Sequence, residues 1–108
     1  MYRGSTPTFS FELPFASSEV DMDKSLITFE QDDEVVLEKT LNECVRDGRV
    51  YHLTLTQEES FEFETGRANV QINLIMVSGQ RLPSQEFKLK IVRNLHDEVI
   101  EVAEDGND

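Results

Sequence analysis

The sequence predicts an all-β domain, an antiparallel β-sandwich of about seven strands with at most one short helical turn. Apolar and polar residues alternate with a period of two in six stretches, and no stretch of helix length repeats apolar residues every three to four positions. Turn-forming residues separate these stretches at intervals of about ten residues. The fold is therefore expected to be immunoglobulin-like or a related Greek key.

The first expected strand covers residues 8–15. Ser10 and Glu12 fall on one face of it. Four apolar side chains fall on the other face: Phe9, Phe11, Leu13 and Phe15. Pro14 cannot donate a backbone hydrogen bond, so the strand should end at an edge or an exit. Residues 1–7 are small and polar and predict a loosely held N-terminal arm.

The next two strands are expected to form a hairpin. Residues 16–25 resemble a loop, and residues 26–31 then place Ile27 and Phe29 on one face. The two short polar residues at 32–33 predict a tight turn into residues 34–41. In that strand we expect three side chains to face the core: Val35, Leu37 and Leu41. Val36 should lie on the opposite face and be partly exposed or covered at an edge.

A second hairpin and the only expected helical turn follow. Asp47-Gly48 predicts a turn into residues 50–55, because glycine tolerates a positive φ. In that strand three apolar residues share a face: Tyr51, Leu53 and Leu55. Thr56 followed by Glu59 matches a capping box, in which each side chain accepts a hydrogen bond from the other's backbone N–H.

The last third of the chain predicts two core strands. Residues 69–77 alternate through Leu74, and Ile75 and Val77 add apolar groups that should be covered on the second face. Residues 86–93 alternate again, with lysines outward and three residues inward: Phe87, Leu89 and Ile91. The expected core is represented by Phe9, Phe11, Leu53, Ile72, Leu74 and Leu89.

The chain has the length of one domain, which we expect to span residues 1–100 and to include the N-terminal arm. Residues 101–108 are acidic and small, and they predict a disordered tail. No apolar run resembles a signal peptide or a membrane span, so we expect a soluble protein made in the cytoplasm, without a secretion signal or membrane contact.

The formal charge of −12 argues against direct nucleic-acid binding, because such a chain repels phosphate. The charge is consistent with plain solubility, with a basic protein partner, or with mimicry of a phosphate array. The sequence alone leaves these alternatives open.

Motifs for catalysis and for cofactors are not found. The two histidines, His52 and His96, resemble solvated side chains, and the glycines are scattered rather than gathered in a phosphate loop. Cys44 is the only cysteine, which suits a small buried group and excludes an internal disulfide. Asp21 and Asp23 are the best of several weak calcium candidates, but no binding loop is complete. We expect no enzyme activity, no cofactor, no bound metal and no small-molecule substrate.

Both ends of the domain offer candidate partner contacts, at residues 1–8 and 94–100. The individual candidates are Tyr2, Arg3, Phe9, Leu95, Val99 and Ile100. Extended termini can add a strand to a neighbour's sheet. The alternative is that both are ordinary frayed ends.

Three segments together resemble small proteins encoded in the tail-gene regions of phages and prophages of Gram-positive bacteria. They are GSTPTFSF at 4–11, LTLTQEE at 53–59, and the strand and turn at 71–79. More distantly, the layout is similar to the N-terminal β-sandwich domain of phage upper baseplate proteins, although this chain lacks their long C-terminal extension. The resemblance implies a structural role and carries no catalytic residues.

With this resemblance, the sequence predicts a non-enzymatic phage or prophage structural or assembly module of the virion or host cytoplasm. It is expected to act in or near the tail baseplate through contacts with other phage structural proteins or with a second copy of itself. The alternative function is an acidic inhibitor that mimics a nucleic acid and blocks a host nucleic-acid-binding protein. A carbohydrate-binding domain is a third option, which an exposed aromatic cluster would support. The absence of Trp counts against that third option.

Overall fold

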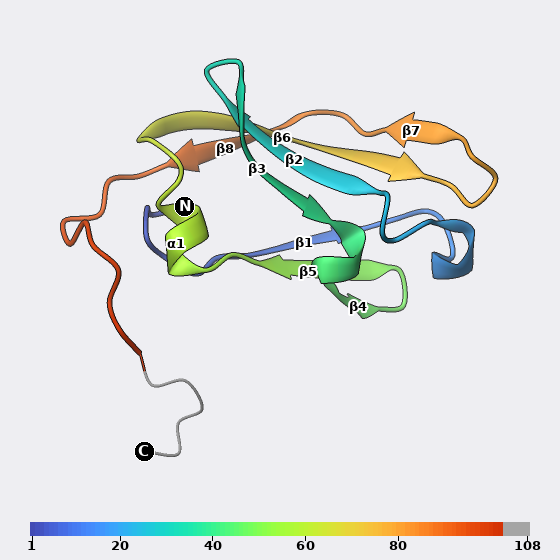
Figure 1. Cartoon of the computed structure of the whole chain (residues 1–108), viewed down its shortest axis with the longest axis horizontal. Coiled ribbons are helices and arrows are strands. Elements are labelled where there is room, and N and C mark those ends of the chain that lie inside the picture. The colour runs from blue at the N-terminus through green and yellow to red at the C-terminus, as the bar shows by residue number, and fades with distance from the viewer. Residues whose placement is uncertain (103–108) are drawn as a thin grey trace.

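The computed structural model describes residues 1–102, which form two antiparallel sheets packed face to face (Figure 1). The smaller sheet has three strands in the spatial order β1 (Thr8–Glu12), β5 (Val50–Thr54) and β4 (Val45–Asp47). The larger sheet contains β3 (Glu34–Thr40), β2 (Leu26–Gln31), β6 (Gly66–Ile75), β7 (Arg81–Pro83) and β8 (Phe87–Ile91). The predicted β-sandwich is confirmed, with eight strands.

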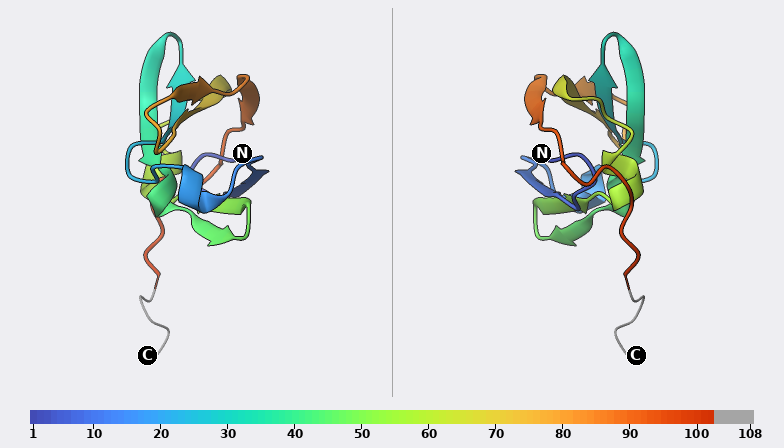
Figure 2. Two further views of the ribbon diagram at one scale, coloured as in Figure 1. Left: turned by 90° about the vertical axis from the view of Figure 1, so that its right-hand side faces the viewer. Right: turned by 90° about the vertical axis from the view of Figure 1, so that its left-hand side faces the viewer.

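Strand β6 is the centre of the larger sheet. It pairs with β2 on one side, and β8 and β7 follow one another along its other side. Figure 2 shows the two layers from the ends of the sandwich, with the C-terminal segment leaving the body.

The chain passes from one sheet to the other three times, and a short helical turn lies at each crossing. Two are 3-10 turns, at Ser17–Glu19 and Leu41–Glu43, and the third is helix α1 (Gln57–Ser60). At α1 the predicted capping box is present: the Thr56 hydroxyl accepts from the Glu59 N–H at 3.1 Å, and the Glu59 carboxylate accepts from the Thr56 N–H at 2.9 Å.

Both predicted hairpins have two-residue loops. Asp32 and Asp33 adopt positive φ angles of 54° and 66°, the conformation of a type I′ turn, which glycine and asparagine favour. In the other hairpin Gly48, at a φ of 63°, is the first loop residue between the paired Asp47 and Val50.

The core lies between the sheets and consists mainly of alternate strand residues. Of the six representative core residues, Leu53, Ile72 and Leu74 are buried, whereas Phe9, Phe11 and Leu89 are half-buried and pack against the core. Other fully covered side chains are Ile27, Phe29, Leu41, Tyr51, Leu55, Phe63 and Ile91.

A β-bulge makes the predicted inward face of residues 34–41 wrong at Val35 and Val36, whereas Leu37 and Leu41 face the core as predicted. Phe29 lies opposite Leu37 and Glu30 lies opposite Val35, so Val36 is the extra residue on β3. Because the bulge shifts the register by one, Val35 is exposed, and Val36 and Leu37 pack against the core.

Two further expectations about side-chain burial were wrong. Strand β6 covers residues 66–75, and Val77 lies beyond it in the following turn with its side chain exposed. Phe87 lies on the core side of β8 but is 51% exposed, because the two sheets diverge at this edge.

Of the predicted tail, residues 101–102 are exposed and without regular structure, and residues 103–108 lie outside the described residues.

Candidate functional site

An apolar groove opens on the side of the sandwich where β1 faces β7 and β8. Its first part has a volume of about 190 Å³ and reaches the core between Phe9 of β1 and Leu89 of β8. A second part, of about 310 Å³, continues toward β7. The two parts share three wall residues: Phe11, Ile72 and Phe87. The groove therefore runs along this edge of the sandwich, and core side chains form its floor.

Both strands that border the groove are edge strands. Strand β1 pairs with β5 alone, and β8 pairs with β6. Met1 and Arg3 form backbone hydrogen bonds with Lys90 of β8 and with Val92 just after it, and with no earlier residue of β8. Within residues 1–102, the outer backbone edges of β1 and of residues 87–89 thus have no neighbouring strand, so an added strand could pair there.

Basic side chains gather beside this groove. Lys88 is one of its lining residues, and Arg67 and Lys90 are direct partners across β6 and β8 on the outer face of the same sheet. Lys88 approaches the Asn69 side-chain oxygen at 3.4 Å. None of the three basic groups has an ion-pair partner in the described part of the chain. They form a positive rim on a protein of strongly negative charge.

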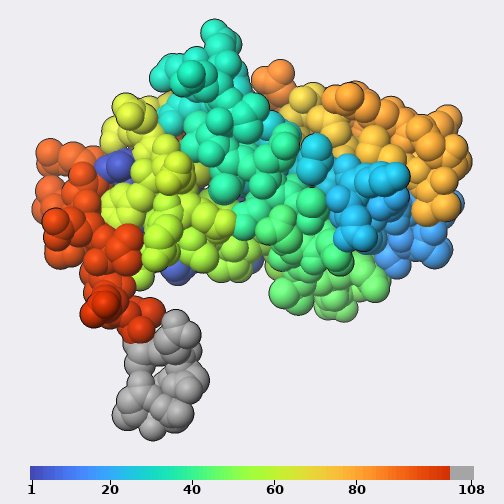
Figure 3. Space-filling view, viewed as in Figure 1, coloured from blue at the N-terminus to red at the C-terminus, as the bar shows by residue number. Residues whose placement is uncertain are grey.

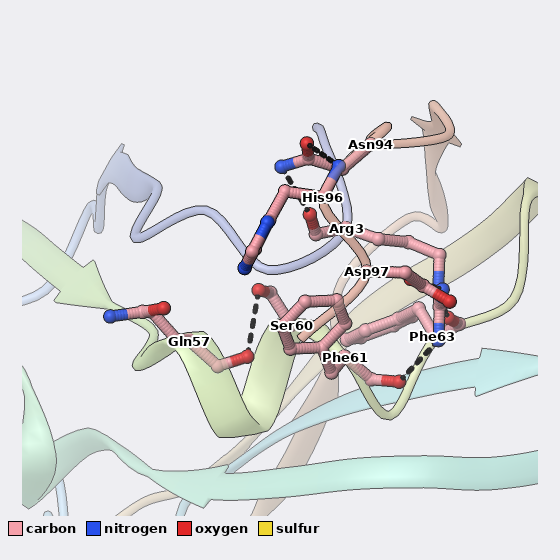
Figure 4. A network of polar contacts seen from close by, with 8 residues as sticks. All are labelled: Arg3, Gln57, Ser60, Phe61, Phe63, Asn94, His96 and Asp97. Carbon is pink, nitrogen blue, oxygen red and sulfur yellow. Dashed lines mark hydrogen bonds and ion pairs between the residues drawn. The ribbon is translucent and has the colours of Figure 1, made fainter. Parts of the chain in front are cut away.

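A second polar centre, around Arg3, ties the N-terminal arm to the rest of the fold (Figure 4). The guanidinium donates from Nε to the Phe63 carbonyl at 2.6 Å and from Nη2 to the Phe61 carbonyl at 3.1 Å. It also pairs with the Asp97 carboxylate and lies 5.2 Å from the centre of the Phe61 ring. The Arg3 carbonyl accepts from the Asn94 side chain at 3.0 Å. Arg3 therefore joins three distant segments of the chain.

The residues next to Arg3 are closely packed. Gly4 has a φ of 81°, and a Cβ atom there would lie 2.3 Å from the Phe61 ring. The fully buried Ser60 hydroxyl donates to the Ser5 carbonyl at 2.7 Å. The arm at residues 1–7 is consequently held against α1 and β8 by specific contacts.

The C-terminal segment rests on α1 through one side chain. The Gln57 amide donates to the Ile100 carbonyl at 2.9 Å and accepts from the Ile100 N–H at 2.8 Å, so it imitates a neighbouring strand. The apolar side chains of the segment line an open hollow with residues 54–58 and stay partly exposed: Val99, Ile100 and Val102 are 44%, 56% and 72% exposed.

The structure separates the predicted contact residues into three groups. Arg3 uses its donors within the chain, and Phe9 lies in the groove, 5.8 Å from the Phe29 ring centre. The others are exposed at the α1 end or on the C-terminal segment: Tyr2, Leu95, Val99 and Ile100.

The sequence reasoning missed Phe87 and Lys88, which border the groove. Their signal was the break at Pro83-Ser84 directly before an edge strand. That break separates β7 from β8, and β8 is a short strand that pairs only with residues 66–70 of β6.

Some ionisable groups outside the groove have pKa values shifted by contacts within the fold. Lys39 pairs with Glu59 of α1 and with Glu43, and its hydrogen bond to Glu59 is the main reason that the Lys39 pKa is raised. Burial alone would raise the pKa of Glu59, but hydrogen bonds from Lys39 and the Thr56 backbone lower it overall. Burial raises the pKa of Cys44 to about 11.

The side chains of the calcium candidates, Asp21 and Asp23, accept hydrogen bonds from other residues of the protein. Asp21 Oδ1 accepts from the backbone N–H groups of Asp23 and Lys24, and Asp23 Oδ1 accepts from Asn42. Across residues 1–102 no group of three or more His, Cys, Asp or Glu side chains could hold a metal ion. Among the same residues, no helix has the length and apolar character to cross a membrane.

Comparison with known proteins shows the fold and no family. No family model matches the sequence, and no curated protein matches it significantly. Among solved structures, CopC from Methylosinus trichosporium OB3b superimposes with a TM-score of 0.53 at 12% identity, covering 92% of this chain and 87% of that one. At this identity the likeness concerns architecture alone: the chain shares its β-sandwich with CopC.

Proposed function

We propose that this chain is a non-enzymatic structural module of a phage or prophage that acts through protein–protein contacts in or near the tail baseplate. The observation that carries the proposal is the apolar groove between β1 and β8, which is bordered by two unpaired strand edges. An extended segment of a partner could pair with an edge through its backbone and place alternate side chains in the groove.

The proposed partner segment is apolar and acidic. The groove walls are mainly aromatic and aliphatic, and the rim beside it carries Lys88, Lys90 and Arg67. Exposed Phe87 is the wall residue whose burial would contribute most to binding, since aromatic anchors dominate interface energetics. The phage setting is supported by the sequence resemblance of residues 4–11, 53–59 and 71–79.

The two other candidate functions have less support. A nucleic-acid mimic needs a surface covered by carboxylates alone. Glu30 of β2 and Glu86, the residue before β8, instead lie near Lys88, which pairs with Asn69 beside them. A carbohydrate site needs neighbouring exposed aromatic rings. The exposed rings of the described residues, Tyr2 and Phe87, belong to opposite ends of β8.

Co-expression with the proteins encoded beside this chain tests the proposal. We expect one of the neighbouring tail proteins to co-elute with it in size-exclusion chromatography with light scattering. Phe87→Asp should abolish that complex, whereas Val35→Asp, an equally charged change at an exposed position of β3, should preserve it. Failure to bind any neighbouring tail protein would refute the proposed function.

A further inference from the structure

We propose that the groove binds the C-terminal segment of a second copy of this chain, so that copies join head to tail. This inference rests on the proposed function and names one partner for its binding site. It follows from the exposure of the C-terminal segment, the shape of the groove and the charges on both.

The C-terminal segment has the character of a strand without a sheet. Three apolar side chains lie within four residues, Val99, Ile100 and Val102, and all are exposed. Within residues 98–102, the backbone forms hydrogen bonds only with the side chain of Gln57. Figure 3 shows this segment projecting from the body of the molecule. An extended apolar segment held this weakly is available to a partner.

The groove provides what the segment lacks. Its apolar walls could cover two or three aliphatic side chains, and the unpaired edges of β1 and β8 could bind the segment's backbone. The exposed ring of Phe87 would become covered in the same step. Burying these side chains would drive association.

Charge favours this occupant. Glu98 precedes the apolar residues, Glu101 lies between Ile100 and Val102, and the sequence continues with Glu104, Asp105 and Asp108. The groove lies beside the rim of Lys88, Lys90 and Arg67, which have no ion-pair partner in residues 1–102. Glu12 lines the second part of the groove, whereas the basic rim lies beside the first part. An acidic, apolar segment therefore complements the apolar walls and the basic rim beside the first part.

The position of the segment favours binding to another copy over folding back. Gln57 holds Ile100 at the α1 end of the sandwich, whereas the second part of the groove is bounded by β7 at the opposite end (Figure 1). Because the donating and accepting surfaces differ, the contact is heterologous, and repetition produces a ring or a filament.

The test uses three full-length variants and measures mass by sedimentation velocity. The groove variant is Phe87→Asp, the segment variant replaces Val99, Ile100 and Val102 with serine, and the control is Val35→Asp. We expect the wild type and the control to form oligomers that grow with concentration, and the groove and segment variants to be monomers. Circular dichroism must show that all three keep the wild-type β-sheet content.

Mixing the two monomeric variants gives the sharpest result. The groove variant still has an intact segment and the segment variant an intact groove, so the mixture should form a 1:1 dimer and nothing larger. Lys88→Glu in the wild-type background should weaken oligomerisation about tenfold in Kd.

Three outcomes would overturn the inference: a wild type that is monomeric at every concentration, oligomers that persist in the groove variant, or a mixture that stays monomeric. A monomer that binds a neighbouring tail protein would overturn self-association and leave the proposed function standing.

Discussion

Replacing Arg3 tests whether one side chain holds the N-terminal arm to the sandwich. Arg3→Ala removes two charged hydrogen bonds to the carbonyls of Phe61 and Phe63, together with the contact to the Phe61 ring. A hydrogen bond from a charged donor contributes about 1.5–3 kcal/mol, and a cation–π contact about 0.5–1 kcal/mol. These terms are not additive, and the Arg3 side chain is 24% exposed. We therefore expect a loss of about 2–4 kcal/mol in the free energy of unfolding.

Urea unfolding followed by circular dichroism measures this loss as a lower midpoint at an unchanged m-value. Arg3→Lys keeps the charge but not the forked donors, so it should recover less than half of the loss. Arg93→Ala is the control, because Arg93 is exposed and forms no side-chain hydrogen bond within residues 1–102. It should change stability by less than about 0.5 kcal/mol.

The ion pair with Asp97 should matter little, because the Asp97 side chain is 62% exposed. Asp97→Ala is expected to cost less than about 1 kcal/mol. An Arg3→Ala loss below about 0.5 kcal/mol, or an Asp97→Ala loss of equal size to that of Arg3→Ala, would refute this reasoning.

The remaining predictions concern local packing and ionisation. Gly4→Ala should lower the free energy of unfolding by at least about 2 kcal/mol more than Gly79→Ala. Both positions have positive φ angles, but only the first would contact the Phe61 ring, so equal losses in thermal melts would contradict the packing argument. Asp33→Gly should stabilise the protein by about 0.5–1 kcal/mol, because glycine adopts the positive φ without strain; an unchanged melting temperature would count against strain there. The stability difference between wild type and Lys39→Met should be constant between about pH 5 and pH 10. The difference should fall in acid, when the pH drops through the lowered pKa values of Glu43 and Glu59 and both become protonated. It should also fall in base, when the pH rises through the raised pKa of Lys39 and that group loses its proton. A pH-independent difference in urea titrations would exclude the ion pair. With a pKa of about 11, Cys44 should react with iodoacetamide at pH 8 about a hundredfold more slowly in the folded protein than in urea, and equal rates would contradict its burial.

The sequence was sufficient to predict the sandwich because most of its signals are local. Period-two alternation, the Asp32-Asp33 and Asp47-Gly48 turns and the capping box at Thr56 depend on residues close together in the chain. Each corresponds to an element of the structure.

Features that depend on distant residues were not predicted. The bulge at Val36 is a property of the pairing of β3 with β2, and alternation within one strand does not reveal it. The exposure of Phe87 depends on where the edges of two different sheets diverge. The internal role of Arg3 depends on carbonyls about sixty residues away. The groove was therefore found only in three dimensions, although one of its residues, Phe9, was among the predicted contacts.

The pairing of the first residues with the last strand affects how the protein is made. The Met1 amino group binds the Lys90 carbonyl at 2.7 Å, and the Arg3 N–H binds the Val92 carbonyl at 3.0 Å. A growing polypeptide on the ribosome cannot form these contacts until residues 90–92 have been synthesised and released from the ribosome. Strands β1 and β5 can associate earlier, but the larger sheet must wait for β8. We therefore expect the sandwich to close only after β8 has left the ribosome, and the nascent hairpins to need protection from aggregation until then.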